Sequence, residues 1–378
     1  MEHSANTAAS ILFAGSTPQN RQSAIDSRAR ISRRRLWVFR FAAMSAGLTA
    51  ALMIAEVTLR VAGWPAPGFY VQGAGPIELS LPGKNGGAFP PGARGELRHY
   101  DYSVTCAVNR YGFRDRELTA RRPDEQRIGI LGDSFTVGIG VDETQRFANL
   151  FAAQLHDQKA NTTVWNLGAP NCGTGCESDM LESVKHDYDL DEVVLAFYAG
   201  NDLQDNEAWL MSQTASPQNN IPRFASGRSW LRKHSRLASF LWVNGIRAWS
   251  SFEPEGIYTA RSFDHYWPTT ERTLNRLRQI VPAGSLTILY LPARPEWDDL
   301  AWQDARKRMT PTGADRFLTK SAVSRWATNH AVRFVDATPW LRACQPAAQC
   351  LFATDPHWTD AGHRLVAKGL LDYWMRER

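Results

Sequence analysis

Residues 127–138 read Arg-Ile-Gly-Ile-Leu-Gly-Asp-Ser-Phe-Thr-Val-Gly, and this stretch decides the predicted fold. An apolar run typical of a buried β-strand stops at Gly132-Asp133-Ser134, and helical spacing follows over residues 143–158. The pattern therefore places Ser134 on a strand-to-helix turn. Such a turn lies at the carboxyl edge of an open α/β sheet, where ligands bind and helix N–H groups can stabilise an oxyanion. Ser134 is the candidate nucleophile.

Strands and helices alternate from residue 127 onward. The expected strands are 127–132, 163–167, 192–198, 286–291 and 332–335, and the expected helices are 143–158, 177–187, 265–280, 314–330 and 360–376. This alternation predicts an α/β fold with a parallel sheet covered by helices on both faces. A long insertion, residues 203–262 with a helical piece near 230–249, interrupts the pattern. Insertions of this length often form a lid or a substrate-binding wall.

The net charge of +5 comes from the N-terminal part of the chain. The first 60 residues contain eight arginines and three acidic residues, which leaves 35 basic and 35 acidic side chains in the rest. A neutral body argues against a nucleic-acid partner.

The N-terminal segment is predicted to anchor the chain in a membrane. Residues 1–32 are polar and are expected to form a disordered cytoplasmic tail. Three arginines, 33–35, then precede the apolar residues 36–55, which as a helix match the thickness of a bilayer core. The segment 33–60 is therefore interpreted as a single-pass signal anchor of a bacterial-type inner membrane, with the following domain periplasmic. A cleaved signal peptide, a twin-arginine signal and a buried amphipathic helix are the alternatives.

A Pro/Gly-rich stretch separates this anchor from the body. Residues 61–120 are interpreted as a linker with accessory strands, one of them near 100–108. Five cysteines are present, and two pairs are close in sequence: Cys172 with Cys176 and Cys344 with Cys350. Both pairs are able to close small disulfide loops in an oxidising compartment, which leaves Cys106 unpaired. Histidines do not cluster with the cysteines at ligand spacing, so a zinc site is not expected.

Further candidate site residues follow the next two strands, and two more lie near the C-terminus. Gly168 follows the second strand, Asn201 follows the third, and Asp355 and His357 precede the last helix. Acyl-transfer chemistry gives each a role. Ser134 attacks a carbonyl, the N–H groups of Ser134 and Gly168 with the Asn201 amide hold the oxyanion, His357 takes the serine proton and Asp355 orients the imidazole.

These residues resemble the SGNH (GDSL) hydrolases. Four blocks carry the resemblance over residues 127–378: Gly-Asp-Ser at 132–134, Gly168, Gly-Asn-Asp at 200–202, and His357. The resemblance implies a three-layer, flavodoxin-like domain at 121–378. It also implies a serine nucleophile, a histidine base and an oxyanion hole from the serine, glycine and asparagine. No metal or organic cofactor is implied.

The last block departs from the common pattern of that family. Its aspartate usually stands three residues before the histidine, where this chain has Thr354; the acid here is Asp355, two residues before His357. In extended backbone, side chains two residues apart point the same way, so the side chains of Asp355 and His357 can still contact each other. This Asp-x-His-Trp form resembles the envelope polysaccharide O-acetyltransferases.

Three functions follow from these residues. The first is a serine esterase that removes an acyl group from an exported or envelope glycan or lipid. The second is a polysaccharide O-acyltransferase, in which a sugar hydroxyl replaces water. The third is a non-catalytic scaffold, which the complete set of Ser134, Asn201 and His357 disfavours.

Overall fold

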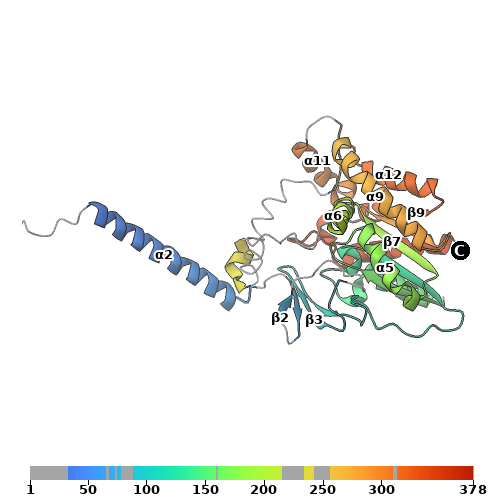
Figure 1. Ribbon diagram of the computed structural model, residues 1–378, viewed down its shortest axis with the longest axis horizontal. Coiled ribbons are helices and arrows are strands. Elements are labelled where there is room, and N and C mark those ends of the chain that lie inside the picture. The colour runs from blue at the N-terminus through green and yellow to red at the C-terminus, as the bar shows by residue number, and fades with distance from the viewer. Residues whose placement is uncertain are drawn as a thin grey trace, which may run out of the picture. The chain divides into compact units, whose positions relative to one another are not determined.

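A computed structural model describes residues 33–64, 68–72, 75–77, 88–158, 161–214, 234–241, 256–309 and 313–377 (Figure 1). The expected tail at 1–32 and most of the helical piece expected near 230–249 lie outside these ranges. The chain divides into two compact units, Met1–Thr58 and Leu59–Arg378.

The first described element is the helix α2 (Arg33–Val61). Its 29 residues form a helix long and apolar enough to cross a membrane, and none of its side chains is buried. The expectation of one apolar N-terminal helix is confirmed.

A parallel five-stranded sheet forms the centre of the second unit (Figure 1). Its strands are β5 (Gln126–Gly132), β6 (Thr162–Gly168), β7 (Glu192–Tyr198), β8 (Leu286–Leu291) and β9 (Arg333–Asp336), in the order β6-β5-β7-β8-β9. The chain leaves β5 for β6 on one side and then crosses to β7 on the other. The strand order therefore reverses at the carboxyl end of β5, which is where open α/β sheets bind ligands.

Helices cover both faces of this sheet. One face packs against α5 (Thr174–Tyr188), α6 (Asp202–Thr214), α9 (Ala260–Ile280) and α12 (Leu318–Asn329). The other packs against α4 (Phe147–Asp157), α13 (Thr338–Arg342) and α14 (Asp360–Arg376). Strand β7 shows why the strands are apolar throughout: Val193, Leu195 and Phe197 enter the first core, whereas Val194 and Ala196 enter the second. The predicted three-layer α/β fold is confirmed.

The boundaries differ from the predicted ones at a few elements. The helix expected over 143–158 starts as the 3₁₀ turn η1 (Glu143–Gln145) before α4 begins, and α9 begins five residues earlier than expected. The helices α10 (Arg294–Trp297) and α11 (Asp299–Arg308) were not predicted. The sequence of α11 is highly charged and has no apolar stripe, and Asp298 caps its N-terminus by accepting from the Leu300 and Ala301 N–H groups.

A small antiparallel sheet precedes the parallel sheet in the chain. Its order is β2-β1-β3-β4, from β1 (Gly68–Val71), β2 (Gly75–Ile77), β3 (Arg94–Arg98) and β4 (Ser103–Ala107). Leu97 of β3 and Cys106 of β4 share a core with Val137, which belongs to the short helix α3 (Ser134–Val137). The small sheet therefore packs directly against the helical turn that carries Ser134.

The buried side chain of Arg114 strengthens this junction. Its guanidinium donates to the carbonyl oxygens of Gly138 at 2.7 Å and of Val141 and Thr105 at 2.8 Å. Two of these carbonyls belong to the loop after α3 and the third belongs to β4. Hydrogen bonds from one charged group to both segments fix them relative to each other.

Candidate active site

The turn between β5 and α3 holds Ser134 at the end of the strand. Asp133 is fully buried and caps α3, because its Oδ1 accepts from the N–H of Phe135 at 2.9 Å. Gly132 lies at a φ of 155°, and a Cβ there would lie 2.1 Å from Thr136 Oγ1. Glycine is therefore required at this position for the chain to turn so sharply into the helix.

His357 reaches the serine from the loop before α14. Its Nε2 lies 2.7 Å from Ser134 Oγ, and its Nδ1 is hydrogen-bonded to Asp355 Oδ1. The same carboxylate oxygen accepts from the His357 backbone N–H at 2.9 Å. The structure thus brings together all three residues of the predicted Ser-His-Asp set. This arrangement lets the imidazole accept the serine proton at Nε2 while the carboxylate holds Nδ1–H.

Asp355 is ionised in this environment. Burial alone would raise the pKa of its carboxyl, but the charge of His357 and hydrogen bonds from the His357 ring and backbone lower the pKa to about 2. Its side chain is only 10% exposed. The ionised carboxylate can therefore stabilise an imidazolium on the neighbouring ring in a setting where water screens it little.

Side chains from the β3–β4 loop contact the other carboxylate oxygen. The Tyr102 hydroxyl donates to Asp355 Oδ2 at 3.1 Å, and His99 Nε2 lies 3.8 Å from the same oxygen. Asp101 from the same loop accepts from Thr354 through both its N–H and its hydroxyl, each at 2.7 Å. The sequence analysis missed these residues, because nothing in the local pattern of 99–102 signals a contact with residues some 250 positions away.

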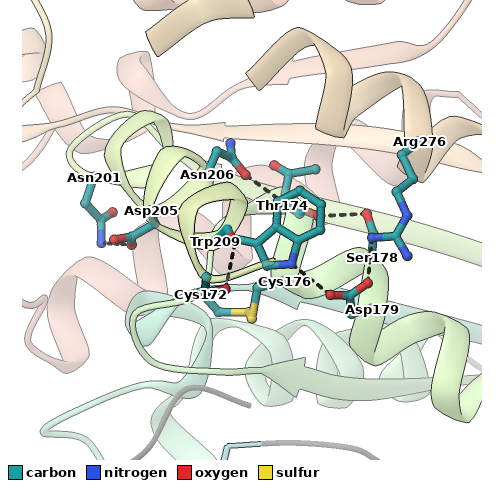
Figure 2. Close-up of a disulfide and its surroundings, with 12 residues drawn as sticks. Cys172, Thr174, Cys176, Ser178, Asp179, Asn201, Asp205, Asn206, Trp209 and Arg276 are labelled. Carbon is teal, nitrogen blue, oxygen red and sulfur yellow. Dashed lines mark hydrogen bonds and ion pairs between the residues drawn. A yellow bond between two sulfur atoms is a disulfide. The ribbon is translucent and has the colours of Figure 1, made fainter. Parts of the chain in front are cut away.

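Asn201 lies at the start of α6 and is held by a carboxyl. Its Nδ2 donates to Asp205 Oδ2 at 2.8 Å, and Figure 2 shows the two side chains facing each other. The Asn201 side chain also interacts with the buried carboxyl of Asp133, which opposes the rise that burial causes in the pKa of that carboxyl. The buried Oδ1 of Asn201 has no hydrogen-bond partner within the described parts of the chain. Asp205 thus fixes the orientation of the amide expected to hold the oxyanion.

Gly168, the other predicted oxyanion donor, is placed differently from that expectation. Its N–H donates to Asn166 Oδ1 at 3.0 Å, so this amide is already used within β6. A Cβ at Gly168 would lie 2.6 Å from the N of Val137. Glycine here allows β6 and α3 to approach closely, which is a packing role. A second glycine, Gly173 at the N-cap of α5, packs against Asp202 and Asn206 of α6 and was not considered from the sequence.

Four buried carboxyls lie near one another behind the nucleophile. Burial raises the pKa of Asp133 to about 6 and that of Asp205 to about 7. Burial and the nearby carboxylates also raise the pKa of Glu177 and of Asp202, both fully buried. Several of these groups therefore hold protons near neutral pH, because their charged forms are poorly solvated and repel one another.

Both predicted cysteine pairs are disulfides. Cys172, in the loop before α5, bonds Cys176, in the first turn of α5, as Figure 2 shows, and Cys344 bonds Cys350 in the segment between α13 and His357. Cys106 is free and buried. The Trp209 ring of α6 is drawn beside the first disulfide, and its Nε1 donates to Asp179 at 2.8 Å. The first disulfide therefore stiffens the loop that leads into a helix packed against α6.

Solved structures of similar fold are distant in sequence. A lipolytic protein of the G-D-S-L family from Veillonella parvula is 14% identical with a TM-score of 0.37, and the match covers 66% of this chain and 99% of that one. A psychrotrophic esterase from Pseudoalteromonas sp. is 11% identical with a TM-score of 0.40, covering 67% and 100%. A two-domain esterase active on acetylated mannans is 14% identical with a TM-score of 0.38, covering 67% and 49%.

No curated protein matches the chain. The family model of the GDSL-like lipases and acylhydrolases matches residues 130–365, which is more than half of the chain and includes Ser134, Asn201, Asp355 and His357. The chain therefore belongs to the GDSL-like lipase/acylhydrolase family, a family of ester-bond hydrolases.

Proposed function

We propose that this protein is a serine esterase that removes an acyl group, such as an O-acetyl group or a lipid acyl chain, from an exported or envelope substrate. The single observation that carries the proposal is the hydrogen-bonded chain from Ser134 Oγ to His357 Nε2, at 2.7 Å, and on from Nδ1 to Asp355. A serine hydroxyl is a weak nucleophile at neutral pH unless a positioned base removes its proton.

The reaction proceeds in two acyl-transfer steps. Ser134 Oγ attacks the ester carbonyl while His357 takes its proton, and Asp355 stabilises the imidazolium that results. The tetrahedral oxyanion is held by the N–H of Ser134 and by the Asn201 amide, which Asp205 orients. The alcohol leaves with the proton from His357, and the acyl-serine remains. Water, activated by His357, then attacks the acyl-serine and releases the acid and the free serine.

The location we propose is the outer face of a bacterial-type inner membrane. Three arginines begin α2 and its apolar run follows, an order that keeps the N-terminal side in the cytoplasm. Two disulfides in the second unit suit an oxidising compartment such as the periplasm. An anchored enzyme in this compartment would meet acylated glycans and lipids of the envelope.

The alternative is transfer of the acyl group to a sugar hydroxyl. The block Asp355-Pro356-His357-Trp358 has the form that resembles envelope polysaccharide O-acetyltransferases. The first half of the reaction is the same in both cases. The difference lies in whether water or a sugar reaches the acyl-serine.

The test labels the full chain in detergent with a fluorophosphonate, which reacts only with an activated serine. We expect wild type and Ser321→Ala, a control on the exposed surface of α12, to be labelled and Ser134→Ala to remain unlabelled. An unlabelled wild type that turns over no aryl acetate would overturn the proposal in favour of a scaffold. Turnover of an aryl acetate with sugars present then separates the two enzymes: unchanged hydrolysis supports the esterase, and acylated sugar formed in place of acid supports the transferase.

A further inference from the structure

The β3–β4 loop, His99–Tyr102, contacts Asp355 from outside the part of the chain that the family model matches. The family match begins at residue 130, so this loop belongs to the small sheet that precedes it. A backbone hydrogen bond from His99 N–H to the Tyr102 carbonyl closes the loop at 2.8 Å. The loop is therefore a tight connection held by its own strands.

The position of the acid in the sequence explains why it needs outside support. Asp355 is two residues before His357, and its Oδ1 accepts from both the backbone N–H and the ring of His357. Both of these hydrogen bonds from His357 go to Oδ1, so His357 does not hold the other carboxylate oxygen, Oδ2. Rotation of the carboxylate would break the ring contact unless a group on the other oxygen prevents it.

That other oxygen faces Tyr102. The hydroxyl donates to Asp355 Oδ2 at 3.1 Å, and the ring is itself fixed between His99, at 5.2 Å between centroids, and Phe352, at 5.0 Å. Burial and the negative charge of Asp355 raise the pKa of the Tyr102 hydroxyl, so it stays protonated and remains a donor. A rigid phenol thus holds the second oxygen while His357 holds the first.

The same loop also fixes the backbone next to the acid. Asp101 Oδ2 accepts two hydrogen bonds from Thr354, the residue immediately before Asp355. His99 Nε2 lies 3.8 Å from Asp355 Oδ2 and its Nδ1 lies 3.8 Å from Asp101 Oδ2. The loop contacts therefore restrain both the main chain and the carboxylate of the last block.

We infer that Tyr102 is a positioning residue for the proposed esterase reaction: its hydroxyl fixes the Asp355 carboxylate in the orientation that His357 requires. This inference rests on the proposed function. It places a determinant of catalytic rate in the accessory sheet, 253 residues from the acid it serves.

The test compares Tyr102→Phe with wild type in the full chain, using aryl acetate turnover per fluorophosphonate-titrated site. We expect kcat to fall about tenfold with KM within about twofold, because one hydrogen bond to a charged group is lost and substrate contacts are unchanged. We also expect the acidic limb of the kcat/KM profile to move to lower pH. Without the hydroxyl, the Asp355 carboxylate is free to turn away from Nδ1 of His357 and stabilises the imidazolium less.

Tyr100→Phe is the matched control, because it makes the same chemical change in the same loop. The Tyr100 hydroxyl is buried without a hydrogen-bond partner among the described residues, and its ring packs on Trp64 at 4.7 Å between centroids. We expect wild-type kcat and an unshifted pH profile for this variant. A loss in Tyr100→Phe equal to that in Tyr102→Phe would overturn the inference, because it would show a general effect of the loop.

A double-mutant cycle with Asp355→Ala separates positioning from structural support. In the Asp355→Ala background, Tyr102→Phe should cause no further loss of kcat per titrated site, since the hydroxyl acts through the carboxylate. An equal tenfold loss in both backgrounds, or a wild-type kcat and pH profile in Tyr102→Phe, would contradict the inference. If the wild type itself takes no label, the proposed function has failed, and that result is distinct from a labelled wild type with an unaffected Tyr102→Phe variant.

Discussion

Thr354 stands where the related hydrolases commonly have the catalytic aspartate, and its contacts show what replaces that acid. Its N–H and hydroxyl both donate to Asp101, whereas the carboxylate on His357 comes from Asp355. The side chain at 354 therefore faces a carboxylate and has no role at the imidazole. The acid lies one residue later than in the common pattern, and the β3–β4 loop contacts both Thr354 and Asp355.

A residue-scale prediction follows for Thr354→Asp combined with Asp355→Ala, which restores the common spacing. We expect this double variant to remain as slow as Asp355→Ala alone in aryl acetate turnover, because the new carboxylate would meet Asp101 at hydrogen-bond distance and be repelled. The control adds Asp101→Asn to the same pair, which removes the repulsion. Recovery of wild-type kcat without the Asp101 change would contradict the assignment of position 354.

At the scale of elements, the short helix α10 contains a buried acid that the reaction does not use. Glu296 is 1% exposed, and it accepts from the Tyr290 hydroxyl of β8 at 2.8 Å and from the Ala293 N–H at 3.0 Å. Burial raises the pKa of its carboxyl to about 8. The folded protein therefore holds this proton at neutral pH, whereas the unfolded chain releases it near the ordinary value of about 4.3.

This difference predicts how stability depends on pH. The contribution of Glu296 is fully present below the unfolded pKa and is lost as pH rises through 8, by at most about 1.4 kcal/mol per pH unit. In Glu296→Gln, whose side chain is neutral like the protonated acid, we expect a free energy of unfolding close to that of wild type at pH 5 and a shallower decline towards pH 9. Urea unfolding across this range measures both, with the exposed Glu271→Gln as control. Parallel curves for Glu296→Gln and wild type would count against a buried protonated Glu296.

At the scale of the whole molecule, the chain consists of a helix able to cross a membrane and a unit that contains the entire candidate site. The division falls after Thr58, and none of the α2 side chains is buried. Catalysis and anchoring should be separable.

We expect the fragment 59–378 to remain in aqueous solution and to hydrolyse a soluble aryl acetate with a kcat within about twofold of the detergent-solubilised full chain. The full chain should sediment with membranes, and a full-length control with Leu48→Lys and Leu52→Lys in the apolar run should lose that behaviour. A folded but inactive fragment beside an active full chain would show that the helix takes part in catalysis.

The sequence by itself determined the layered fold and pointed to Ser134, His357 and Asp355, which the structure brings together. Strands β7 and β8 match their predicted bounds, and the other three strands of the parallel sheet differ by a residue or so at their ends. The reason is physical. A parallel strand covered on both faces must be apolar throughout, so it is visible in the sequence as a continuous run of apolar residues. The Gly-Asp-Ser turn and the approach of His357 follow from the same logic, because parallel strands place their following loops at one edge of the sheet.

Only the tertiary structure decided the contacts between distant segments. The Gly168 N–H bonds Asn166, so its predicted oxyanion role gives way to a packing role, and Tyr102 reaches Asp355 across 253 residues. The helix α11 has a charged sequence without an apolar stripe and went unpredicted. The local spacing of apolar residues in the sequence indicates which residues are buried. Which donor meets which acceptor depends on how separately formed elements pack, and this is why the surroundings of the catalytic acid became visible only in the folded molecule.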